Sequence, residues 1–126
     1  MAILVNKPVE CTIGSLPAIQ FKGSSTRLTS DAQNALAGVA STVKANPNCK
    51  VKVIGYGTAS KAARQLSWER VNAVIKYLVE KQGIAESRLL FVYEQDGSSN
   101  TVDLMGTLED GPSYVPAPHP NLKSNN

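Results

Sequence analysis

The sequence is poor in the residues from which most catalytic and metal centres are built. It has one histidine, His119, and two cysteines, Cys11 and Cys49, among 126 residues. His119 stands between two prolines near the C-terminus, where nothing supplies a partner or further metal ligands. A Cys-His or Ser-His-Asp device on the folded core is therefore excluded. We predict a chain that is not an enzyme, with no metal and no cofactor.

Long apolar runs and blocks of like charge are missing as well. No segment approaches the roughly 20 apolar residues that cross a bilayer, and the apolar run at 2–5 is too short for a signal peptide. The net charge is +3, but the basic residues are dispersed, which argues against nucleic acid as a partner. With 42% hydrophobic and 18% charged residues, the composition is that of a globular domain with one core.

Hydrophobic periodicity predicts the element order β-α-β-α-β-β. A first helix should begin at Ser30, which with Gln33 has the spacing of a capping box, and end before Asn46-Pro47. A second should run from about Lys61 to Gln82-Gly83. Each helix has one apolar face, so we expect an α+β fold, a two-layer sandwich with both helices on one face of a mixed sheet. The expected strands are 16–21, 49–56, 88–93 and 100–105.

The same patterns divide the chain into three parts. Residues 1–15 show little periodicity and are expected to be a linker. Residues 16–105 hold all predicted elements and form the domain. Residues 106–126 are rich in proline, glycine and asparagine and should be a disordered or surface-laid tail.

One charge falls inside the apolar face of the second predicted helix. Arg70 comes one turn after Leu66 and one turn before Val74. A buried cation costs several kcal/mol unless it is paired, so Arg70 has a protein partner or an anionic ligand, unless its head reaches water. The turn at 55–60 leads into the same helix, whose N-terminus favours an anion. A ligand carboxylate could therefore bind Arg70 while the rest of the ligand meets this turn.

A larger set of residues resembles the OmpA-like family of peptidoglycan-binding domains, of the Pal and MotB type. The similarity covers about residues 16 to 105, and the L-S-x-x-R core is its most specific part. The pattern is similar to a divergent branch found in Bacteroidetes outer-membrane proteins. The matching residues are Gly55-Tyr56, Leu66-Ser67-x-x-Arg70-Val71-x-x-Val74, Tyr77-Leu78-Val79, Gly83-Ile84 and Arg88-Leu89.

The resemblance implies a periplasmic, outer-membrane-associated domain that grips the stem peptide of peptidoglycan and tethers an outer-membrane protein. Arg70 would take a ligand carboxylate, while Tyr56, Thr58 and Ser60 would line the mouth of the site. The family aspartate that pairs with the ligand's ammonium has no counterpart in the turn 57–60, and Asp103 would stand in for it. The alternative is a structural or protein-interaction module that has lost this ligand, with Arg70 paired internally to an acidic group such as Asp103.

The resemblance also bears on the two cysteines. From the residues alone, Cys11 and Cys49 are either free thiols in a cytosolic chain or a disulfide in an exported one. The export that the resemblance implies favours a Cys11–Cys49 disulfide.

Overall fold

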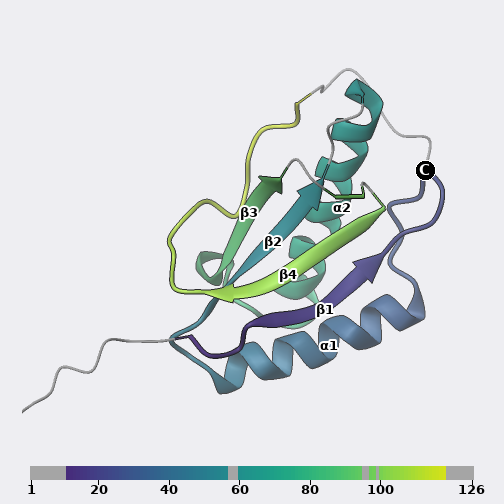
Figure 1. Cartoon of the computed structure of the whole chain (residues 1–126). Helices are drawn as coiled ribbons and strands as arrows, with labels where there is room; N and C mark the ends of the chain where they lie inside the picture. Colours follow the sequence, from purple (N-terminus) through teal and green to yellow (C-terminus); the bar gives the residue numbers. More distant parts are fainter. Residues whose placement is uncertain (1–10, 57–59, 95–96, 99, 119–126) are drawn as a thin grey trace, which may run out of the picture.

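Two helices cover one face of a four-stranded mixed sheet (Figure 1). The computed structural model describes residues 11–56, 60–94, 97–98 and 100–118. The predicted element order and the two-layer α+β fold are confirmed. The elements are β1 (Ser15–Gln20), α1 (Ser30–Ala45), β2 (Lys50–Tyr56), α2 (Lys61–Glu80), the 3-10 turn η1 (Glu86–Arg88), β3 (Leu89–Glu94) and β4 (Thr101–Thr107).

The strand order is β1-β4-β2-β3. Strands β2 and β3 are parallel and joined through α2, whereas β4 lies antiparallel between β1 and β2. Side chains alternate between the two faces of a strand. Val53 and Leu104 are therefore buried against the helices, whereas Ile54 and its partner Asp103 point to the opposite, open face. This alternation decides which candidate residues can meet.

The N-terminus of α1 differs from the predicted capping box by one residue. Thr29 is the N-cap, and its hydroxyl accepts a hydrogen bond from the Ala32 N–H at 3.1 Å. Extended backbone at Thr29 (φ −71°, ψ 169°) aims this oxygen at the free amides of the first turn. Ser30 is instead the first helical residue, and Gln33 donates to the Leu28 carbonyl.

The buried face of α2 also departs from the apolar pattern near its start. Ala63 and Leu66 are only half-buried, whereas Ser67 is 1% exposed. The Ser67 hydroxyl donates to the Tyr56 carbonyl at 2.7 Å, which satisfies it at the end of β2. Gly55 permits this close approach, because a Cβ there would lie 2.6 Å from a methyl carbon of Val71.

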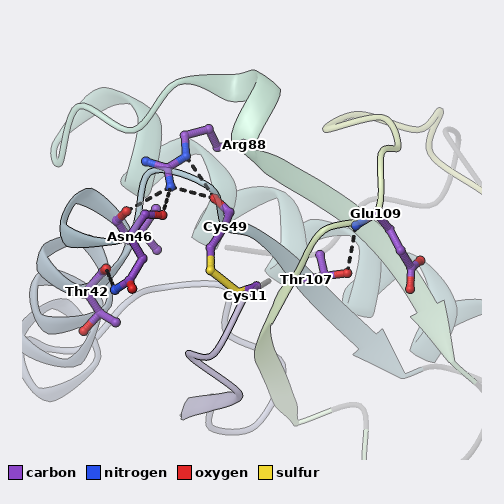
Figure 2. Close-up of a disulfide and its surroundings, with 8 residues drawn as sticks. Cys11, Thr42, Asn46, Cys49, Arg88, Thr107 and Glu109 are labelled. Atoms are coloured by element: carbon purple, nitrogen blue, oxygen red, sulfur yellow. Dashed lines mark hydrogen bonds between the residues drawn. A yellow bond between two sulfur atoms is a disulfide. The ribbon is translucent and has the colours of Figure 1, made fainter. Parts of the chain in front are cut away.

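A disulfide joins Cys11 to Cys49, directly before β2 (Figure 2). Beside it, Arg88 donates to the carbonyls of Val43, Asn46 and Cys49 at 2.6–3.1 Å. These carbonyls lie at the C-terminal end of α1 and just beyond it, where helical partners run out. Arg88 therefore fixes the end of α1 and the start of β2 at the same point as the disulfide.

Residues outside the predicted domain take part in the fold. The Gly106 N–H donates to the Gly14 carbonyl at 2.8 Å, and β4 continues to Thr107. Beyond it, residues 108–118 lie along β3 and reach α2 (Figure 1). Among the described residues, neither helix combines the length and apolar character that crossing a membrane requires. His119 lies outside the described residues.

Candidate functional site

Arg70 is completely buried, with 0% of its surface exposed. Its Nε donates to the Ser25 carbonyl at 2.9 Å and its Nη2 to the Gly23 carbonyl at 2.7 Å. Its Nη1 donates to Oδ1 of Asn100 at 3.0 Å. The guanidinium also lies over the Phe21 ring, 5.0 Å from the centroid, where a cation is attracted to the π face.

Two loops bring these acceptors to Arg70. In a tight turn after β1, the Ser25 N–H donates a hydrogen bond to the Lys22 carbonyl, and Gly23 adopts φ +54°. A left-handed backbone favours glycine at this position. The other loop joins β3 to β4, and its Asn100 carbonyl accepts the Phe21 N–H at 2.8 Å. Arg70 thus ties the β1–α1 loop to the β3–β4 loop at one end of the sheet.

Burial lowers the pKa of Arg70, but a guanidinium starts so high that it stays charged at any physiological pH. Charge-assisted hydrogen bonds are stronger than neutral ones, so each bond from Arg70 contributes more than an ordinary loop contact. The site is chemically a fixed, desolvated cation surrounded by oxygen acceptors.

Asp103 does not accompany Arg70, and the predicted internal pair between them is wrong. The Asp103 side chain points to the open face of the sheet, where its carboxylate accepts a hydrogen bond from the Tyr56 hydroxyl. Arg70 lies on the helix-covered face. The odd and even positions of a strand point to opposite sides, so β4 cannot present Asp103 to α2.

Tyr56 lies with Asp103 and away from Arg70. Tyr56 is 8% exposed as a residue, and Gly97 of the β3–β4 loop packs directly on its ring. A Cβ on Gly97 would lie 2.4 Å from the ring. Tyr56 and Asp103 thus form a closed pair under this loop, and the structure does not place Tyr56 at a mouth beside Arg70.

The structure describes only one of the two predicted site residues in the turn before α2. Ser60 is exposed and is the N-cap of α2, accepting from the Ala63 N–H at 3.1 Å. Its hydroxyl oxygen is therefore already engaged as the hydrogen-bond acceptor that caps the helix. Ten residues of helix separate it from Arg70, or about 15 Å along the axis. Thr58 lies outside the described residues.

The Tyr56–Asp103 pair predicts a loss of stability at alkaline pH. Burial, the hydrogen bond to Asp103 and the charges of Asp103 and Glu94 raise the pKa of Tyr56 to about 12. Above pH 10 the unfolded chain loses this proton while the folded chain retains it, so stability falls as pH rises towards 12. We expect the parent to lose about 2 kcal/mol more than Tyr56→Phe over this range, measured by urea unfolding.

Burial raises the pKa of Tyr93 as well, so both proteins should weaken at high pH. The comparison with Tyr56→Phe separates the two tyrosines. An identical pH dependence in parent and variant would contradict the role given to Tyr56.

The partners of Arg70 were not predicted from the sequence. Gly23 and Ser25 contribute backbone carbonyls, which every residue type carries, so no side-chain pattern marks them. Among the acceptors on described residues, Asn100 is the one that uses its side chain. Its position just before β4 was visible, but only the fold shows that it faces Arg70.

Comparison with known proteins agrees with this fold. The sequence model of the OmpA family matches residues 20–110. No curated protein matches the chain. The fold is similar to the C-terminal domain of Helicobacter pylori MotB (TM-score 0.61, 16% identity, covering 75% of this chain and 86% of that one).

Two further solved structures are similar. The OmpA-like domain of FopA1 from Francisella tularensis has a TM-score of 0.60 and 17% identity, covering 86% of this chain and 74% of that one. The peptidoglycan-associated lipoprotein from Burkholderia pseudomallei has a TM-score of 0.60 and 17% identity, covering 71% and 89%. At such identities the structures support the fold alone. The family match spans most of the chain, and the chain therefore belongs to the OmpA family.

Proposed function

We propose that this chain is a non-catalytic domain of the bacterial periplasm that binds the stem peptide of peptidoglycan and anchors an outer-membrane protein to the cell wall. The observation that carries the proposal is the fixed cation of Arg70 at the junction of two loops. A similar structure is named a peptidoglycan-associated lipoprotein. The Cys11–Cys49 disulfide fits an exported chain.

A ligand carboxylate would reach Arg70 by displacing Asn100. Among the acceptors on the residues that the structure describes, a side-chain rotation removes Asn100 Oδ1 from the guanidinium, whereas Gly23 and Ser25 contribute backbone. Asn100 is itself exposed. A carboxylate is the stronger acceptor for a guanidinium, so the exchange is favourable once the ligand is in place. Thr58 and Ser60 would meet the remainder of the ligand.

The test is an NMR titration of the labelled chain with stem-peptide fragments. Fragments containing diaminopimelate should shift the Arg70 Nε–H and the amides of Ser25, Ser60 and Asn100. Asn100→Ala removes the competing acceptor and should bind at least as tightly as the parent. Arg88→Lys, which changes an arginine at the far end of β2, should leave binding unchanged. An absence of shifts at millimolar fragment would refute the proposal.

The complete burial of Arg70 favours a second candidate, a structural or protein-interaction module that has lost the ligand. In that case Arg70 serves only to join the two loops. Asn100→Ala distinguishes the candidates, because a purely structural joint would be weakened by the variant and would acquire no affinity for the fragments.

A further inference from the structure

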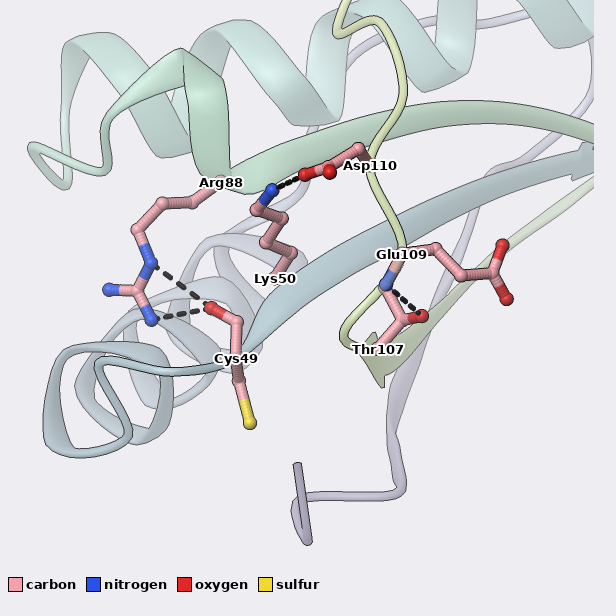
Figure 3. Close-up of polar contacts among 6 residues, drawn as sticks. All are labelled: Cys49, Lys50, Arg88, Thr107, Glu109 and Asp110. Atoms are coloured by element: carbon pink, nitrogen blue, oxygen red, sulfur yellow. Dashed lines mark hydrogen bonds and ion pairs between the residues drawn. The ribbon is translucent and has the colours of Figure 1, made fainter. Parts of the chain in front are cut away.

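The C-terminal segment 108–118, here called the strap, wraps around the edge of the sheet. It first crosses the open face of β2, where Glu109 pairs with Lys52 at 2.9 Å. There Asp110 also pairs with Lys50, as Figure 3 shows. The strap then passes β3, the last strand of the sheet, where the Phe91 N–H donates to the Pro112 carbonyl at 2.8 Å. The strap therefore covers a strand edge that would otherwise present unpaired amides.

Beyond β3 the strap reaches an aromatic surface formed by Trp68, Phe91 and Tyr93, of which Phe91 is 6% exposed and belongs to the hydrophobic core. The Trp68 indole N–H donates to the Val115 carbonyl at 2.8 Å. Tyr114 packs edge-on against the Trp68 ring, with centroids 6.2 Å apart. Phe91 lies between the other two rings, 6.4 Å from Trp68 and 5.3 Å from Tyr93.

These contacts are those by which proteins recognise extended, proline-containing peptides. Such peptides dock on aromatic side chains and offer carbonyl oxygens to donors of the receptor. The strap has three prolines within 112–118, and proline cannot donate to a sheet ladder, so the segment lies on the edge without becoming a fifth strand. Its indole contact is made to a backbone carbonyl, which any extended peptide offers.

The strap is attached by exposed ion pairs near its start and by Val115, which packs against the hydrophobic core, further along. Its ion pairs are exposed, with 87% of the Asp110 and 66% of the Glu109 side chain accessible, and such pairs contribute at most about 1 kcal/mol each. Tyr114 is 60% exposed despite its contact with Trp68. A tethered segment also benefits from an effective concentration in the millimolar range. Weak contacts therefore suffice to hold it in place, and a competing peptide could replace it.

We infer that the surface of Trp68, Phe91 and Tyr93 is a peptide-binding site for an extended segment with a Tyr-x-Pro sequence, and that the chain's own Tyr114-Val115-Pro116 occupies it as an internal ligand. The partner is a protein that carries such a segment and displaces the strap. This site is separate from Arg70, because Trp68 and Arg70 are two residues apart on α2 and hence about 200° apart around its axis. The inference stands whether or not peptidoglycan is bound.

The experiment uses the full chain and a synthetic peptide of residues 108–118. Trp68 is the only tryptophan, so its indole N–H gives a single resonance that reports on the site. A full-length variant with Glu109→Gln, Asp110→Asn and Tyr114→Ala loosens the strap at exposed positions, where folding is not at risk. We expect its indole resonance to move, and the added peptide to return it towards the parent position.

The parent chain should bind the same peptide at least tenfold more weakly than the loosened variant, because its own strap competes; isothermal titration calorimetry measures both affinities, since peptide and strap make the same contacts to the indole. A peptide of scrambled sequence should leave the resonance in place. Trp68→Phe, which keeps a ring but removes the donor and the indole signal, should weaken binding as measured by calorimetry. The inference is overturned if the loosened variant keeps the parent resonance, since the strap is then an integral part of the fold. It is equally overturned if several millimolar peptide leaves the indole resonance of the loosened variant unchanged, or if the scrambled peptide moves that resonance as the native peptide does.

Discussion

Arg70→Leu should lower the free energy of unfolding by about 3 kcal/mol, although leucine matches the apolar face of α2. The variant leaves the carbonyls of Gly23 and Ser25 and the side-chain oxygen of Asn100 without their donor. An acceptor abandoned in a buried place costs about 1–3 kcal/mol, and water reaching the exposed loops should recover part of this. Equilibrium unfolding in urea measures the change.

A matched control is Arg27→Leu. Arg27 lies in the same β1–α1 loop, but it is exposed, so its replacement should change stability by no more than about 0.5 kcal/mol. Arg70→Lys should fall between parent and Arg70→Leu, because one ammonium cannot reach three acceptors in the fixed geometry of a guanidinium. If Arg70→Leu were as stable as the parent, the two loops would not depend on Arg70, and its burial would need another cause.

Reduction of the Cys11–Cys49 disulfide should have an effect of similar size. The bond closes a loop with a sequence separation of 38, for which the chain-entropy account gives about 4 kcal/mol of stability. The loop contains β1 and α1, so the unfolded chain gains freedom over a third of the domain once the bond is broken. Unfolding in urea with and without a thiol reductant measures the loss.

A double variant, Cys11→Ser and Cys49→Ser, supplies the control for the reductant. It should be destabilised to about the level of the reduced parent, and reductant should change it no further. Arg88 still holds the Cys49 carbonyl in both proteins, so the start of β2 should remain in place while residues 11–13 lose their covalent attachment to it. Equal stability of oxidised and reduced parent would show that the disulfide contributes nothing to the fold.

These two effects act at opposite ends of β2. The disulfide and Arg88 hold the end where β2 begins (Figure 2). Arg70 joins the loops at the end where β2 stops. The proposed ligand site is at the second end only. The disulfide variants should therefore weaken the fold without changing the affinity for stem-peptide fragments, measured under conditions where the chain remains folded.

The family resemblance, the element order and the burial of Arg70 were accessible from the sequence. Helical and strand periodicities are local, because they follow from geometry repeated every 3.6 or every two residues. They therefore located α1, α2 and the strands to within a residue or two. They also placed Arg70 on the buried face of α2, where it lies at 0% exposure. The Cys11–Cys49 disulfide, favoured by the resemblance, is present as well.

Tertiary structure decided what those residues touch. Strand register sends Asp103 and Tyr56 to the open face, away from Arg70, and register is a relation between strands that no single segment carries. The acceptors of Arg70 include two backbone carbonyls, which have no signature in the sequence. From the sequence, the strap was likewise predicted to be part of a tail. A proline-rich composition indicates a stiff segment, but it does not indicate that this segment lies on Trp68. Local periodicity thus determined the elements and their buried faces, and only their packing determined which groups meet.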